Sequence, residues 1–152
     1  MLSKQDAGII IDELRQEKGL SWSELAERAE CPNVWLVSAV LGMHPVPEEV
    51  AEFLRKELEL DDELVKALRR QPTRVPEREI ATDPTIYRFH ELIDVYGPAL
   101  KALIHDEFGD GIMSAINCSL DFKRVEHPGG DRVHITIDGK YLPYDWVQSG
   151  EK

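Results

Sequence analysis

The sequence contains little that would serve a disulfide framework or a metal site. It has only two cysteines, Cys31 and Cys118, which lie far apart and in no metal-ligand spacing. Its five histidines form no His-x-x-x-His or His-Glu-x-x-His pattern, the spacings that place two imidazoles on one helix face. We therefore expect two buried, reduced thiols and neither a structural nor a catalytic metal.

Long apolar runs and an excess of positive charge are also absent. The longest apolar stretches are far shorter than the ~20 residues that span a bilayer. The first residues do not have the pattern of a signal peptide, because the acidic Asp12 and Glu13 directly follow a run of three isoleucines. The formal net charge of −11 argues against a nucleic-acid partner. These observations predict a cytoplasmic protein that binds neither a membrane nor nucleic acid.

The composition is that of a soluble globular protein. The 152 residues are 42% hydrophobic and 31% charged, which is enough chain for one ordinary domain or two small ones. Residues 1–70 have the apolar spacing and the capping residues of five short helices. The first helix carries a stripe of isoleucines with Leu14 and ends near Gly19, and the second starts at Ser21 or Ser23. The third runs from Asn33 to a stop at Gly42, the fourth follows Pro45 and Pro47, and the fifth is capped by Asp61 or Asp62.

This helix order resembles the helix-turn-helix bundle of lambda-repressor-type proteins, most clearly in the phrase GLSWSELAERAECPNVWLVSAVLG. In such a fold the third helix reads the major groove of DNA. Here that helix, NVWLVSAVLG, contains no arginine or lysine, and its main polar side chains are Asn33 and Ser38. Reading helices contact phosphates and bases through basic or amide side chains. We therefore predict that the helix packs against protein, with a DNA-binding regulator as the alternative.

A proline-rich segment, residues 71–84, follows the bundle and is predicted to be an extended linker. It leads to a second domain, residues 85–152. Thr82 or Asp83 is expected to cap the first helix of this domain, with Pro84 at its first position. The dipeptide Gly97-Pro98 is expected to break that helix, and Ala99–Phe108 to form a separate one that stops at Gly109.

Alternating apolar residues predict a β-hairpin after these helices. The run SLDFKRVE, residues 119–126, reads as one strand, and Val133, Ile135 and Ile137 mark the other. HPGGD is expected to be the turn between them, DGK a second turn before Tyr141, and residues 144–152 a frayed end. Because an isolated two-stranded ribbon is marginally stable, we expect a second copy of the chain to complete it.

Two residues of the second domain, Arg88 and Glu91, are three positions apart and therefore neighbours on one helix face. One interpretation is an ordinary surface ion pair. Arg88 is, however, the only arginine or lysine between Arg78 and Lys101, and Tyr87 and Phe89 flank it. A guanidinium in such a place is suited to binding a small anion, with Glu91 holding it or moving a proton.

Ser114 lies in the phrase FGDGIMSAIN, which we expect to be a tight, glycine-bracketed connection. A serine there can offer its hydroxyl and, with Ala115, exposed N–H groups to an anion. No Gly-x-Ser-x-Gly elbow surrounds it, so a nucleophilic role is disfavoured. The alternative is a serine that only satisfies its own turn.

The phrases TDPTIYRFHE, VYGPALKALIHDEFGDGIMSAIN and DGKYLP resemble the core of the cyanases, also called cyanate hydratases. The resemblance covers about residues 80–143 and, more loosely, the helical N-terminal part. It implies a catalytic set of Arg88, Glu91 and Ser114, and the residues themselves place Ala115 beside Ser114 in substrate binding. His90 departs from the tyrosine expected there.

The resemblance also implies the reaction. Cyanases combine cyanate with bicarbonate to give carbon dioxide and carbamate, which decomposes to ammonia and carbon dioxide. Bicarbonate is then a co-substrate and no metal or organic cofactor is needed. Family members form homodecamers of five intertwined dimers with active sites between subunits.

Together these observations predict an α+β protein: a five-helix bundle that resembles a helix-turn-helix domain, followed by a small catalytic and dimerisation domain with a shared hairpin. Two other functions are considered. In an anion-responsive regulator, the bundle would bind DNA and the second domain would sense the anion. In a purely structural scaffold, nothing would depend on Arg88 or Ser114.

Overall fold

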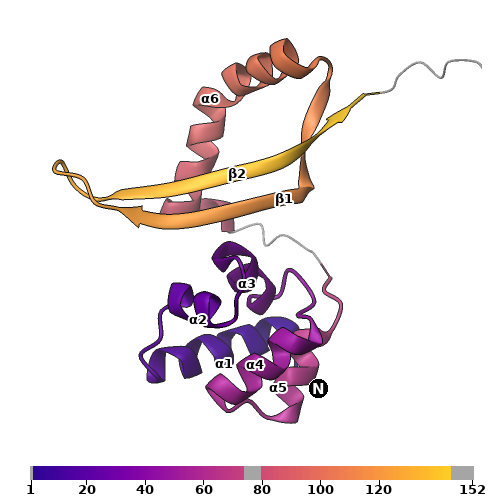
Figure 1. Cartoon of the computed structure of the whole chain (residues 1–152), viewed down its shortest axis with the longest axis vertical. Helices are drawn as coiled ribbons and strands as arrows, with labels where there is room; N and C mark the ends of the chain where they lie inside the picture. Colours follow the sequence, from indigo (N-terminus) through magenta and orange to yellow (C-terminus); the bar gives the residue numbers. More distant parts are fainter. Residues whose placement is uncertain (1, 74–79, 145–152) are drawn as a thin grey trace, which may run out of the picture. The chain divides into compact units, whose positions relative to one another are not determined.

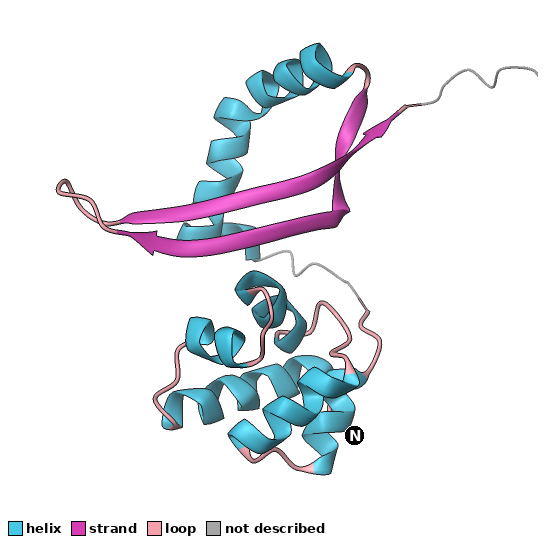
Figure 2. Cartoon of the chain, in the orientation of Figure 1, coloured by secondary structure: helices cyan, strands magenta, loops and turns pink. Residues whose placement is uncertain are grey.

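The computed structural model describes residues 2–73 and 80–144, and it confirms the predicted α+β class. Helices precede one two-stranded antiparallel sheet, as Figures 1 and 2 show. In chain order the elements are α1 (Lys4–Glu17), α2 (Trp22–Arg28), α3 (Asn33–Val40), α4 (Glu48–Leu58), α5 (Asp62–Arg69), the 3₁₀ turn η1 (Ile80–Thr82), α6 (Pro84–Phe108), β1 (Gly111–Val125) and β2 (Arg132–Pro143).

The five predicted helices of the bundle are confirmed, and their caps explain where they start. The Ser21 hydroxyl accepts a hydrogen bond from the Glu24 amide at 3.1 Å, and the Glu24 carboxylate accepts one from the Ser21 amide at 2.7 Å. Asp61 caps α5 by accepting from the Leu64 amide at 2.8 Å. The helices enclose a common core whose largest fully buried side chains are Ile11, Leu25, Leu36, Val40, Leu54, Leu58 and Leu68.

Helix α6 starts as predicted but does not break where we expected. Asp83 accepts hydrogen bonds from the amides of Thr85 and Ile86 at 2.8 and 2.9 Å, and Pro84 takes the first helical position. The predicted break at Gly97-Pro98 is wrong, because α6 is one 25-residue helix with Pro98 inside it. Proline removes one helix hydrogen bond and bends the axis without ending the helix, and Figure 1 shows α6 changing direction along its length.

The strands are longer than the alternation predicted. β1 begins at Gly111, so the phrase around Ser114 belongs to a strand, and the predicted connection there is wrong. β2 runs from Arg132 to Pro143, so DGK is strand and not a second turn. Figure 1 shows a sharp bend in β1. The turn that the glycines do provide lies earlier, at Gly109, where φ is +94° at the end of α6.

The chain divides by its internal contacts into two compact units. The first unit contains the bundle and Leu120–Ile137, which is the middle of the hairpin along the sequence. The second unit contains η1, α6, the part of β1 up to Ser119 and the part of β2 from Asp138 onward. The predicted boundaries at residues 70 and 85 stay a prediction. Part of the predicted linker (74–79) and nearly all of the predicted frayed end (145–152) lie outside the described residues.

The two cysteines are not joined to each other. Cys31 and Cys118 are both free, as expected, but they are half-buried rather than buried. Burial and the nearby Glu30 carboxylate raise the pKa of the Cys31 thiol.

No helix in the described part of the chain is long and apolar enough to cross a membrane.

Candidate functional site

The first turns of α6 carry the predicted pair, Arg88 and Glu91. The Asp83 cap and Pro84 fix the start of the helix, so both side chains project from the same face one turn further on. The guanidinium Nη1 of Arg88 donates to Oε2 of Glu91 at 2.8 Å. This hydrogen bond, together with the negative charge of Glu91, raises the pKa of Arg88. Arg88 therefore stays charged, and its ion pair with Glu91 is pre-formed within one chain.

The guanidinium has donors to spare. The Arg88 side chain is 72% exposed and the Glu91 side chain 52% exposed. Arginine carries five N–H donors in a planar fork, and the hydrogen bond to Glu91 uses one of them. In a side chain this exposed, the remaining donors are available to the oxygen atoms of a small anion. The hydrogen bond to Glu91 thus limits the rotation of the Arg88 side chain and leaves its other N–H groups for a ligand.

Ser114 is one of only two buried polar or charged side chains in the described residues, with 6% of it exposed. Its Oγ accepts two backbone hydrogen bonds, from the Ile116 amide at 3.1 Å and the Asn117 amide at 2.8 Å. Both acceptor sites of the hydroxyl are thus engaged, so its O–H is left to donate. The geometry therefore favours a serine that donates a hydrogen bond to an anion.

The two hydrogen bonds to Ser114 Oγ form a local turn within β1. Serine side chains that accept from amides two and three residues later close a local turn, in competition with the strand ladder. The spacing Ser-x-x-Asn was visible in the sequence, but the amides of Ile116 and Asn117 were not foreseen as part of the site. Ala115, between Ser114 and these amides, is exposed.

The structure brings together two of the predicted residues and leaves the third apart. Arg88 and Glu91 form one ion pair on α6, whereas Ser114 lies on β1, and within residues 80–144 no hydrogen bond joins the serine to either partner. No group of three or more metal-binding side chains occurs in the described residues. The roles assigned to Arg88, Glu91, Ser114 and Ala115 stay a prediction.

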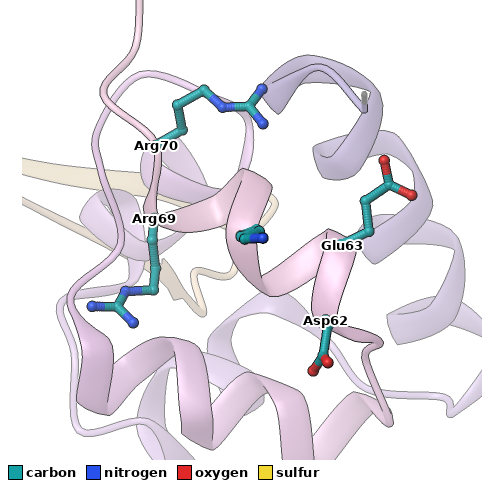
Figure 3. A pocket seen from close by; sticks show the side chains of 5 residues that line it. Asp62, Glu63, Arg69 and Arg70 are labelled. Carbon is teal, nitrogen blue, oxygen red and sulfur yellow. The ribbon is translucent and has the colours of Figure 1, made fainter.

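Two hollows in the surface contain none of these residues. One, of about 910 Å³, lies along α5 and is lined by Asp62, Glu63, Lys66, Arg69 and Arg70. Figure 3 shows the acidic side chains at the start of α5 and the arginines at its end, which is the arrangement that the helix dipole favours. The other, of about 390 Å³, lies between α6 and the start of β1 and is mainly apolar.

Comparison with known proteins supports the sequence resemblance over both parts of the chain. The model of the cyanate hydratase N-terminal domain matches residues 7–72, and that of the cyanate lyase C-terminal domain matches residues 78–146. The chain is 54% identical to the cyanate hydratase of Mycolicibacterium vanbaalenii over 148 residues, 96% of each chain. It is 52% identical to that of Pseudomonas savastanoi pv. phaseolicola over 128 residues, 84% of this chain and 83% of the other.

A solved structure gives the same answer for the fold. The crystal structure of cyanase from T. urticae superposes with a TM-score of 0.83 at 38% sequence identity, covering 91% of this chain and 97% of that chain. These matches do not favour the DNA-binding regulator, because the helix-turn-helix-like bundle is itself part of the enzyme family. The chain belongs to the cyanate hydratase (cyanase) family of lyases.

Proposed function

We propose that this protein is a bicarbonate-dependent cyanate hydratase. Cyanate, bicarbonate and one proton give carbamate and carbon dioxide, and carbamate with a second proton gives ammonia and carbon dioxide. The observation that carries this proposal is the match of both parts of the chain to one enzyme family. The exposed guanidinium of Arg88, held by Glu91 at 2.8 Å, supports it as a site for small anions.

Electrostatics decide how the site must be built. Cyanate and bicarbonate are both monoanions, and two such charges about 4 Å apart repel by roughly 4 kcal/mol at an effective dielectric constant near 20. Arg88 alone supplies one positive charge, and Glu91 beside it cancels much of that field. A site that receives an Arg88 from each of two subunits offsets this repulsion. The proposed active site therefore lies between copies of the chain.

The side chains then have separate tasks. Arg88 binds and neutralises the anions, and Glu91 orients Arg88 and can pass on the proton that the reaction consumes. Ser114 donates its hydroxyl hydrogen to an anion oxygen, and the Ala115 amide adds a second donor. A bicarbonate oxygen attacks the cyanate carbon, and the fixed placement of the two anions supplies much of the rate gain.

The exposed apolar surface of the second domain supports an obligate oligomer. Phe89, Leu92, Ile93, Leu100 and Leu103 on α6 and Ile116 on β1 are all at least 47% exposed in the single chain. Large apolar side chains exposed in this number mark an interface, and a two-stranded ribbon needs further partners to be stable. A second copy of the chain satisfies both requirements. We propose a homodecamer of five dimers, as in the family, located in the cytoplasm and without a nucleic-acid or membrane partner.

The experiment that tests this function measures ammonia release from cyanate by the purified protein. It is run in buffer depleted of carbon dioxide, with and without added bicarbonate. We expect ammonia only when bicarbonate is present. A folded, oligomeric protein that releases no ammonia under either condition would contradict the proposal, and ammonia release independent of bicarbonate would contradict the role of the co-substrate.

A further inference from the structure

Gly139 lies in β2, directly against the part of β1 that carries Met113 and Ser114. A Cβ atom added to it would lie 2.4 Å from Cγ and 2.8 Å from Sδ of Met113, and 2.9 Å from the carbonyl oxygen of Ser114. Real Cβ atoms essentially never show contacts under 3.0 Å. A glycine inside a strand often marks such a close approach of another backbone. The missing side chain is therefore what allows β2 to pack against this part of β1.

The segment that Gly139 touches is the one that holds the Ser114 hydroxyl. The Ser114 carbonyl faces Gly139, while its Oγ accepts from the amides of Ile116 and Asn117 at 3.1 and 2.8 Å. The backbone of Ser114 is thus limited by β2 on one side, and its side chain is held by β1 itself. A shift of the backbone at Ser114 changes where the hydroxyl points.

We propose that Gly139 is a positioning residue for the reaction, because only glycine lets β2 fix the backbone of Ser114 and so the direction of its hydroxyl. This inference depends on the proposed role of Ser114 in binding the substrate anions. Gly139 itself contacts no substrate and acts through Ser114. The sequence had suggested a turn at DGK, and the signal that was missed is a glycine inside an otherwise alternating strand.

Other glycines of the hairpin supply a matched control. Gly129 lies between the strands, and a Cβ atom there would meet only the His127 ring, at 3.4 Å, which is ordinary contact. Gly111 also has a close approach, to the Leu142 carbonyl oxygen and the Tyr141 ring, but not to Ser114. Gly129→Ala therefore makes the same chemical change in the same hairpin without crowding the serine.

The test compares Gly139→Ala with Gly129→Ala in the full-length, assembled protein. For Gly139→Ala we expect kcat for ammonia release to fall by about 10- to 100-fold at unchanged assembly, since a displacement of about 1 Å can cost that much. Gly129→Ala should stay within about twofold of the wild type. Hydrogen exchange at the Ile116 and Asn117 amides should become faster in Gly139→Ala only. A wild-type kcat in Gly139→Ala would overturn the inference.

A double-mutant cycle separates positioning of Ser114 from general damage. If Gly139 acts through the hydroxyl of Ser114, then adding Gly139→Ala to Ser114→Ala should cost little further activity. A full additional loss of 10-fold or more in that background would overturn the inference. The comparison of kcat values does not depend on how far each variant lowers stability, because each kcat is expressed per assembled site.

Met113→Ala covers the case in which Gly139→Ala does not assemble. It removes two of the three crowding atoms and leaves the Ser114 oxygen at 2.9 Å. Met113→Ala with Gly139→Ala should therefore still have at least 10-fold lower kcat than Met113→Ala alone. Equal activity of these two would mean that only the Met113 side chain is crowded, which overturns the inference. A wild-type protein that releases no ammonia would overturn the proposed function, whereas an active wild type with unaffected Gly139 variants overturns this inference alone.

Discussion

The helical bundle buries its apolar side chains within one chain, whereas α6 and the two strands leave theirs exposed. Every buried hydrophobic residue in the described part of the chain lies between Ala7 and Leu68. On α6 and the two strands, by contrast, Leu103 is 65% exposed, Val133 70% and Ile116 97%. Exposing side chains of this size to water costs about 1.5–3 kcal/mol each relative to burial. The bundle sequence thus encodes a fold, and the sequence after it encodes both a fold and an interface.

This difference also separates stability from chemistry. The proposed catalytic residues all lie in the part that is incomplete alone, where a second copy can contribute to the site. The bundle, whose sequence resembles a helix-turn-helix domain, has no basic residue on α3. Changes in the bundle should therefore act on stability, and changes on α6 should act on assembly or turnover.

The largest expected effect comes from placing a charge on the apolar face of α6. Leu103→Asp should abolish assembly and ammonia release at micromolar concentration, because an unpaired carboxylate would have to be buried between subunits. Size-exclusion chromatography with light scattering measures the assembly. Hydrogen exchange across residues 4–69 should stay close to the wild type, because the bundle core does not depend on α6.

A matched control lies one turn along the same helix. Glu107→Asp introduces the same side chain at an exposed polar position and should leave both the assembly and the activity unchanged. Wild-type assembly of Leu103→Asp would mean that this face of α6 stays in water, which would break the comparison between the two regions.

The next effect concerns the chemistry without the assembly. Arg88→Leu should lower kcat/KM at least 10³-fold, about 4 kcal/mol, since it removes the positive charge that holds two anions together. Steady-state ammonia release measures it, with chromatography to show intact oligomers. Arg69→Leu is the control in the bundle, because Arg69 is also a partly exposed arginine, paired with Glu48 at 3.2 Å. Substantial turnover in Arg88→Leu would remove Arg88 from the site.

How much of the fold was predictable differs between the two regions for the same reason. The bundle helices follow from local signals, such as the reciprocal bonds of Ser21 and Glu24 and the cap at Asp61. Around Pro98 the local signal misleads, because a proline in a long helix bends it rather than ending it. The spacing and the flanking residues singled out Arg88, Glu91 and Ser114 as candidates, and the family resemblance implied their catalytic roles.

The strands were harder to predict, because their residues are chosen by contacts across the hairpin. The tripeptide DGK has the composition of a turn, yet Gly139 lies in β2. Glycine is required there because Met113 and Ser114 leave no room for a side chain. In the same way, the sequence around Ser114 predicted a connection, but Ser114 lies in β1. Its hydroxyl oxygen accepts hydrogen bonds from two backbone amides. Neither fact can be read from nearest neighbours in the sequence.

A smaller effect, confined to the bundle, should appear as a pH dependence of stability. Lys4 is 4% exposed, and its ammonium donates to the Leu68 carbonyl at the end of α5. Burial, and then repulsion by Arg70, lowers the pKa of Lys4 from 10.5 to about 8. Between pH 8 and pH 10.5 the unfolded chain therefore binds more protons than the folded one, so this group makes the bundle more stable as the pH rises.

Urea unfolding of the wild type and of Lys4→Met measures this contribution. The wild type should gain at most about 2 kcal/mol relative to Lys4→Met between pH 8 and pH 10. Other titrating groups cancel in the difference between the two proteins. In a Trp146→Phe background, the fluorescence of Trp22 and Trp35 reports on the bundle alone. A difference that does not change with pH would show that Lys4 is not shielded from water.

The smallest effect tests how locally the bundle is encoded. Glu30 follows α2 with φ at +53°, a left-handed conformation that costs a side chain more than it costs glycine. Glu30→Gly should therefore stabilise the bundle by about 0.5–1 kcal/mol. Glu27→Gly makes the same change inside α2, where glycine is unfavourable, and should destabilise it by a similar amount. Urea unfolding with the same fluorescence readout compares them. Opposite signs three residues apart would show that backbone conformation, and not the loss of a carboxylate, determines the result, whereas equal signs would mean that the charge dominates.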